Sequence, residues 1–112
     1  MHPSADETTE HALLTDAVHT WGTHAQLVMA LEEMAELSKE VAKTIRTGTP
    51  TENLADEIAD VEIMLAQLRI IATELGHAEF ARAVAERKAF KLGRIRQRLR
   101  DWKATHSAGG AL

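Results

Sequence analysis

Side chains placed to face a helical core recur every three or four residues between positions 54 and 75. This seam consists of Leu54, Glu57, Val61, Met64, Leu68, Ile71 and Leu75. The spacing is typical of a helix that packs against other helices, and it predicts a helix over 50–75 that ends at Gly76. Glu57 is the one polar member. A carboxylate that faces a core is costly unless it is paired or binds a metal, although a glutamate near a helix start can also reach solvent or a lysine.

Few residues that break helices interrupt the rest of the chain. The sequence of 112 residues contains two prolines, Pro3 and Pro50, and its aromatic content is 4%. Both features favour an all-α protein, because strands favour aromatic and β-branched residues and helix interiors exclude proline. The four predicted helices span 9–20, 25–46, 50–75 and 78–103.

Two segments have the pattern of capping boxes at helix starts. One begins at Thr23 and the other at Thr49, and Pro50 is expected at the first helical position. Gly48 is expected to take a left-handed conformation that ends the second helix. Because the connection that follows is about four residues long, the second and third helices must be antiparallel neighbours.

The predicted architecture is an antiparallel bundle of about four helices in a single domain over 1–112. Its ordered core is expected over about 9–105, with flexible ends. Helices of about 22–26 residues are long for so small a domain, at 1.5 Å of rise per residue. One chain cannot cover all of their faces, so we expect a dimer or a dimer of dimers.

Composition excludes several kinds of protein and site. The chain has no cysteine, which rules out a disulfide framework, a thiolate metal site and a cysteine nucleophile. It has no apolar run of about 18 residues and no leader-like start, so we expect no membrane span and a cytoplasmic location. The net charge of −4 conceals a split: residues 1–79 carry 15 acidic and 4 basic side chains, whereas residues 80–112 carry 2 acidic and 9 basic ones.

The second predicted helix concentrates carboxylates on one side. Within an arc of about 100° lie Glu32, Glu33, Glu36 and Glu40. The main apolar stripe, on the other side, consists of Leu27, Leu31, Met34, Val41 and Ile45. A solvated acidic face is one interpretation. The other is a Mg²⁺ site, because Mg²⁺ prefers oxygen ligands and no lysine or arginine lies between Asp16 and Lys39 to neutralise these carboxylates. Antiparallel pairing would bring two pairs to one level of the hairpin, namely Glu33 with Glu36 and Glu57 with Asp60.

The last predicted helix carries the opposite charge. Lys88 occupies a core slot between Val84 and Leu92, and Lys91 and Arg94 follow on that side. Carboxylate-bound Mg²⁺ beside lysine and arginine describes a polyphosphate site, in which the metal bridges phosphate oxygens and the cations neutralise the remaining charge. The alternative for Lys88 is an aliphatic stem that packs on the core while its ammonium reaches water.

These residues together match a family pattern. Glu32-Glu33-Met34-Ala35-Glu36, followed after 20 residues by Glu57-Ile58-Ala59-Asp60, has the form EExxE…ExxD. This pattern resembles the MazG-like all-α nucleoside triphosphate pyrophosphohydrolases, a superfamily that also includes the dimeric dUTPases and the phosphoribosyl-ATP pyrophosphatases. The resemblance covers about 18–100 and extends to Trp21-Gly22, Gln26-Leu27, the segment 52–57 and the Lys88…Lys91…Arg94 run. The chain lacks the extra segments that some relatives use to enclose a base, which leaves base selectivity open.

The resemblance implies a Mg²⁺-dependent enzyme, with Mn²⁺ as a substitute, that hydrolyses nucleoside or deoxynucleoside triphosphates to the monophosphate and pyrophosphate. The implied metal ligands are Glu33, Glu36, Glu57 and Asp60. The implied catalytic residues are Glu32 and Glu33, with Glu32 as a further ligand or as the residue that orients the attacking water. The implied phosphate contacts are Lys88, Lys91 and Arg94, and the residues expected near the base or sugar are Trp21 and Gln26. A homodimer or homotetramer and a role in nucleotide-pool control or house-cleaning are also implied.

Three other interpretations compete. Glu74 and His77 form an ExxH motif, but di-iron bundles use two such motifs and only one is well formed here. A non-enzymatic dimer could bind nucleic acid through its basic C-terminal helix, although Arg94, Arg96 and the arginines after them spread around that helix and the acidic body would repel a phosphate backbone. A plain scaffolding bundle is the third. Neither of the last two explains Glu57 in a core slot.

Overall fold

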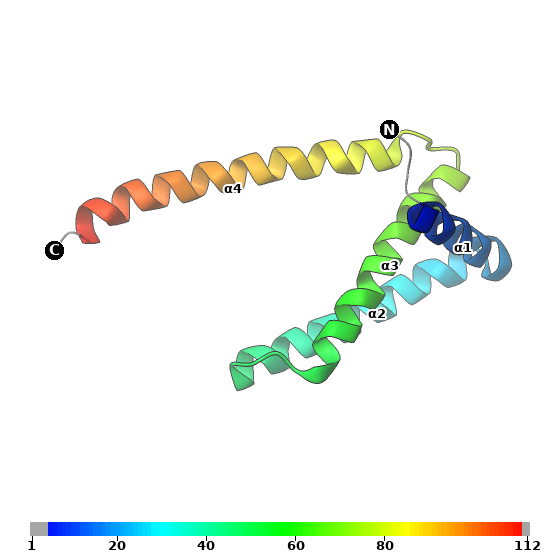
Figure 1. Ribbon diagram of the computed structural model, residues 1–112, viewed down its shortest axis with the longest axis horizontal. Helices are drawn as coiled ribbons and strands as arrows, with labels where there is room; N and C mark the ends of the chain where they lie inside the picture. The colour runs from blue at the N-terminus through cyan, green and yellow to red at the C-terminus, as the bar shows by residue number, and fades with distance from the viewer. Residues whose placement is uncertain (1–4, 111–112) are drawn as a thin grey trace. The chain divides into compact units, whose positions relative to one another are not determined.

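The computed structural model describes residues 5–110 of the chain, with side chains described over 9–107. It contains four helices, α1 (Ala5–Trp21), α2 (Thr23–Thr47), α3 (Glu52–Glu74) and α4 (Phe80–Gly110), and no strand occurs within 5–110 (Figure 1). The all-α prediction is confirmed. Helix α1 begins earlier and α4 continues further than predicted. Of the predicted flexible ends, residues 1–4 and 111–112 lie outside the described part.

The described residues divide into two units, one that ends at His77 and one that begins at Ala78. In the first unit α2 and α3 form the predicted antiparallel hairpin, and α1 packs against both helices (Figure 1). The apolar core of this unit consists of Leu14, Val18, Ile70 and Ile71, with Ala66 packed against it. This core joins α1 to the C-terminal half of α3, so the N-terminal half of α3 is left to pair with α2.

Glycine governs both ends of α2. Gly22 donates its N–H to the Val18 carbonyl at 2.8 Å, and its own carbonyl accepts from the Gln26 N–H at 3.2 Å. At φ 90° this one residue therefore ends α1 and begins α2. The prediction that Thr23 caps α2 is wrong, because Gly22 holds the cap position and no side chain bonds to the cap. Gly48 ends α2 at φ 78°, as predicted.

The start of α3 also differs from the prediction. Thr51 is the cap residue and Glu52 is the first helical residue, so Pro50 precedes the helix and the capping box expected at Thr49 does not form. The Thr51 hydroxyl makes no cap hydrogen bond, because it donates to a side chain of α2. At the other end of α3 the Gly76 N–H bonds to the Thr73 carbonyl and the next N–H to the Ala72 carbonyl, which is a Schellman motif.

The faces of α2 are arranged differently from what hydrophobicity alone suggests. All five members of the predicted apolar stripe are exposed: Leu27, Leu31, Met34, Val41 and Ile45. The covered side instead carries Gln26, Ala30, Glu33, Leu37 and Glu40. These positions are spaced by four, three, four and three residues, so they form one helical face. Helix α2 therefore turns a largely polar face toward α3 and leaves an apolar stripe at the surface.

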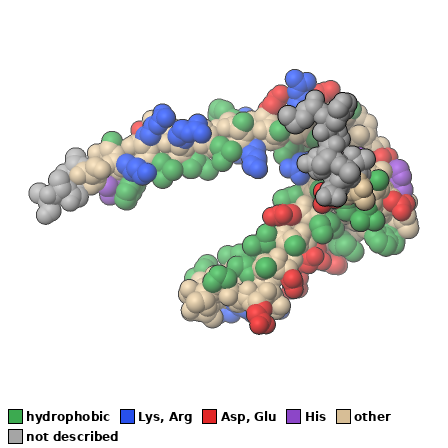
Figure 2. Space-filling view, in the orientation of Figure 1, with side chains coloured by type: hydrophobic (Ala, Val, Ile, Leu, Met, Phe, Trp, Pro, Cys, Tyr) green, Lys and Arg blue, Asp and Glu red, His purple; other side chains and the backbone are tan. Residues whose placement is uncertain are grey.

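The second unit is the long helix α4. Hydrophobic side chains lie in a row along one edge of it, and basic side chains are spaced along its length (Figure 2). The exposed apolar residues are Phe80, Phe90, Leu92, Ile95, Leu99 and Trp102. Within the part of the chain that the structure describes, no helix combines the length and apolar character needed to cross a bilayer.

Candidate metal centre

Three carboxylates meet across the α2–α3 hairpin. Glu33 comes from α2, and Glu57 and Asp60 come from successive turns of α3; one oxygen of each lies within 4.8 Å of the others. Glu57 and Asp60 are three residues apart, which places them on one side of their helix. The short connection between the helices brings that side opposite Glu33. The predicted convergence of the two acidic motifs is thus present for three of its four members.

Burial and mutual repulsion act on this cluster. Glu33 and Glu57 are half-buried, and this burial is the largest cause of a raised pKa at each of them. The negative charge of Asp60 is the next cause for both carboxyls. The site therefore concentrates negative charge, and a bound cation would relieve the repulsion between its carboxylates.

One oxygen of the cluster has no partner. The Oε2 atom of Glu57 is buried and makes no hydrogen bond with any described residue. A buried acceptor without a partner is costly, and such atoms often mark the place of a water or an ion. All donors here are carboxylate oxygens, which suits Mg²⁺ or Mn²⁺ better than a soft metal. The residues present therefore fit a hard divalent cation. Among the described residues, the group formed by Glu33, Glu57 and Asp60 includes no histidine, so this group does not support the di-iron interpretation.

The other two predicted acidic residues lie at the edge of the site. Glu36 is exposed, and its charge helps to raise the pKa of both Glu33 and Glu57, so it acts on the cluster without being one of the three converging carboxylates. Glu32 is also exposed. Its neighbour Glu33 therefore stands closer to the centre of the site, whereas the predicted role of Glu32 toward water stays a prediction.

The burial of Glu40 between α2 and the start of α3 was not predicted from the sequence. The residue is 3% exposed, its Oε1 accepts from the Thr51 hydroxyl at 2.8 Å, and its Oε2 accepts from Lys43 Nζ at 3.2 Å. The Thr51 hydrogen bond is the largest cause of a lowered pKa at Glu40. A signal was present in the sequence, because Gln26, Glu33 and Glu40 are spaced by seven residues and hence share a face.

The two residues predicted near the base or sugar differ in accessibility. Trp21 ends α1 and is 64% exposed, so its ring is available to a ligand. Gln26 is 2% exposed and lies in the interior of the first unit. Gln67 on α3 is buried as well, and its Oε1 has no partner among the described residues. A contact between Gln26 and a base would require this interior layer to open.

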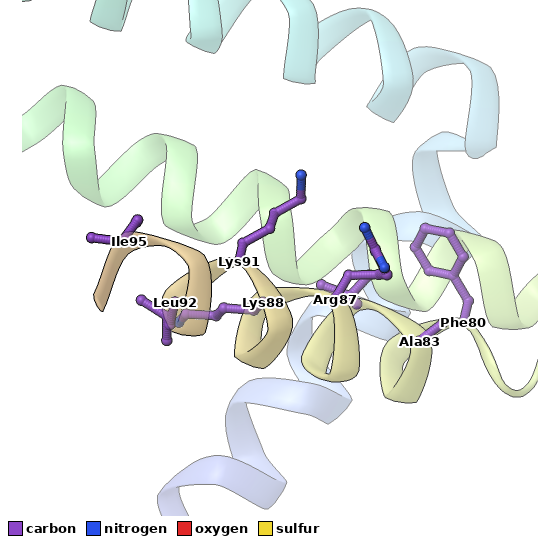
Figure 3. A pocket seen from close by; sticks show the side chains of 8 residues that line it. Phe80, Ala83, Arg87, Lys88, Lys91, Leu92 and Ile95 are labelled. Carbon is purple, nitrogen blue, oxygen red and sulfur yellow. The ribbon is translucent and has the colours of Figure 1, made fainter. Parts of the chain in front are cut away.

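The predicted phosphate contacts all lie on α4, in the second unit. A hollow on this helix is lined by Phe80, Ala83, Val84, Arg87, Lys88, Lys91, Leu92 and Ile95 (Figure 3). Figure 3 shows Arg87 and Lys91 extended to the same side as Phe80, while the Lys88 stem runs toward Leu92. Lys88 and Arg94 are exposed. The helix thus joins cations to an apolar surface, and the predicted approach of these cations to the carboxylates stays a prediction.

Comparisons with known proteins do not add to this picture. No family model, no curated protein and no solved structure matches the chain.

Proposed function

We propose that the protein is a cytoplasmic, Mg²⁺-dependent nucleoside triphosphate pyrophosphohydrolase that forms the monophosphate and pyrophosphate from an NTP or dNTP. The observation that carries the proposal is the meeting of Glu33, Glu57 and Asp60 across the hairpin, with the partnerless Oε2 of Glu57 among them. A solvated acidic face does not account for a buried oxygen of this kind. The resemblance of the two acidic motifs to the MazG-like family supports the choice of reaction.

We assign metal binding, orientation of the attacking water and phosphate contacts to different residues of this chain. Glu33, Glu57 and Asp60 would hold the metal, and the exposed Glu36 is placed to join them from the rim. Bound Mg²⁺ supplies charge stabilisation on phosphate oxygens and acidifies water. Glu32, exposed next to Glu33 on α2, would orient the attacking water or serve as a further ligand, as the family resemblance implies, and Glu33 is the second catalytic residue through its contact with the metal. Lys88, Lys91 and Arg94 would neutralise the phosphates that the metal does not contact.

Assembly into a homodimer or a dimer of dimers belongs to the same proposal. The apolar stripe of α2 and the apolar row of α4 are exposed over many residues. Large exposed apolar faces on a small protein mark interaction surfaces. A second copy of the chain would cover them, which agrees with the oligomers that the family resemblance implies.

The proposal is tested by a screen over NTPs, dNTPs and modified nucleotides with Mg²⁺ and detection of released pyrophosphate. The wild-type protein is compared with Glu57→Gln and with Glu62→Gln, which changes an exposed glutamate on the same helix. We expect turnover of at least one nucleotide by the wild type and by Glu62→Gln, and none by Glu57→Gln, with all three folded by circular dichroism. Full activity of Glu57→Gln would remove the carboxylate cluster from the mechanism.

A further inference from the structure

The contact between Glu40 and Thr51 is a direct side-chain hydrogen bond between α2 and the cap residue of α3. Thr51 is the cap residue of α3, yet its hydroxyl does not cap that helix. It donates instead to Glu40, eleven positions earlier, at 2.8 Å. The contact therefore fixes where α3 begins relative to α2.

Folding stability alone does not explain a glutamate at position 40. The carboxylate is nearly inaccessible, and its ion-pair partner Lys43 lies on its own helix and is itself partly exposed. A buried charge of this kind is commonly replaceable by an apolar side chain of similar volume without loss of stability. An apolar side chain, however, would not fix the position of α3 along α2. Apolar contacts allow two helices to shift along one another, whereas a hydrogen bond of this length requires the two atoms to stay in place.

The geometry links this contact to the candidate metal centre. Glu33 lies seven residues before Glu40 along α2, about 10 Å away, and Glu57 lies six residues after Thr51 along α3, about 9 Å away. In an antiparallel hairpin these two paths run in the same direction from the Glu40–Thr51 contact. Their lengths match to within about one residue of rise, so the contact places Glu33 and Glu57 at one level.

We propose that Glu40 and Thr51 are positioning residues for the metal centre, and that their hydrogen bond sets the hairpin register that brings Glu33 to Glu57 and Asp60. Neither residue ligates the cation. This inference rests on the proposed function only in requiring that the three carboxylates bind a divalent metal. Supporting groups outside the ligand set typically change metal affinity by about 10- to 100-fold when they are lost.

The test is a titration of the metal-free protein with Mn²⁺, in which the electron paramagnetic resonance signal of free Mn²⁺ reports binding without nucleotide or turnover. Thr51→Val removes the hydroxyl and keeps the shape, and Thr51→Ser restores a hydroxyl. Thr49→Val is the matched control, because the contacts of Thr49 with Thr47 are made by its backbone. All titrations are run well below the unfolding transition of each variant.

We expect Thr51→Val to raise the Kd for Mn²⁺ by about ten-fold, and Thr51→Ser and Thr49→Val to stay within about two-fold of the wild type. In a Glu40→Leu background, adding Thr51→Val should cause no further loss, because the Glu40–Thr51 contact is already broken there. Wild-type affinity in Thr51→Val, even with a lowered Tm, would overturn the positioning role and leave the metal site standing. Absence of Mn²⁺ binding by the wild type would overturn the metal site and this inference together.

Discussion

The packing of α1 on α3 makes a stability prediction that two neighbouring leucines can test. Leu14 is 8% exposed and belongs to the apolar core with Val18, Ile70 and Ile71, whereas Leu13 is 65% exposed. Both lie in α1, so replacing either by alanine changes helix propensity equally. The difference between Leu14→Ala and Leu13→Ala therefore isolates the burial of one side chain.

The size of the effect follows from the carbons removed. Truncating Leu14 withdraws three nearly buried carbons at about 0.8 kcal/mol each and leaves a cavity, so we expect a loss of about 3 kcal/mol in the free energy of unfolding. Truncating Leu13 removes the same carbons from a side chain that is mostly in water, and the loss should stay below about 1 kcal/mol. For a domain of this size the two Tm values should differ by about 10 °C.

Urea denaturation followed by circular dichroism at two protein concentrations measures both variants. The slope of unfolding free energy against urea should be unchanged, which shows that the same surface is exposed on unfolding. Comparison of the two concentrations separates loss of folding from loss of assembly. Equal destabilisation by the two substitutions would refute the packing of α1 described above.

Three further predictions concern charge, backbone and substrate. The pKa of Glu33 and that of Glu57 are raised, so the folded, metal-free protein binds protons more tightly than the unfolded chain. Its Tm should therefore rise as the pH falls toward the ordinary carboxyl value of 4.5, near which the gain should stop, and Glu57→Gln should flatten the profile. Gly48→Ala should destabilise the fold by about 1 kcal/mol, because φ is 78° at this residue. Gly93→Ala in α4 should instead stabilise its helix by about 0.5–1 kcal/mol. Urea denaturation measures both changes, and a change of the same sign in the two variants would contradict the prediction. Lys88→Ala should lower kcat/KM for the preferred nucleotide at least about ten-fold with little change in Tm, with Lys103→Ala as the control, and unchanged kinetics would remove Lys88 from the site.

Helix positions were predictable because their signals are local. The seam over 54–75 and the glycines at 48 and 76 each act within a few residues, and the helices between them form as expected. The capping boxes failed for a reason that is not local. Gly22 replaces Thr23 as the cap because its positive φ joins two helices in one residue, and Thr51 gives its hydroxyl to a partner on another helix.

The orientation of α2 could not be predicted from hydrophobicity. Its apolar stripe suggested a buried face, but α3 packs against the face that carries Gln26, Glu33 and Glu40. Two constraints compete in such a helix: apolar area favours one face, and satisfaction of polar groups across the hairpin favours the other. The convergence of Glu33, Glu57 and Asp60 could be predicted because it needs only antiparallel pairing and three-residue spacing. The role of Glu40 could not be predicted in this way. It depends on Thr51, which holds the cap position of α3 but donates its hydroxyl to Glu40 instead of capping the helix.

Anomalous diffraction from a crystal of the wild-type protein grown with Mn²⁺ tests most directly whether these three carboxylates bind a metal. We expect an anomalous peak within ligand distance, about 2.2 Å, of carboxylate oxygens of Glu33, Glu57 and Asp60, with the Oε2 of Glu57 among the ligands. The same measurement on Glu57→Gln should show the peak lost or strongly weakened. A wild-type map with no peak at these carboxylates, under conditions in which Mn²⁺ binds elsewhere on the protein, would rule out the proposed metal centre.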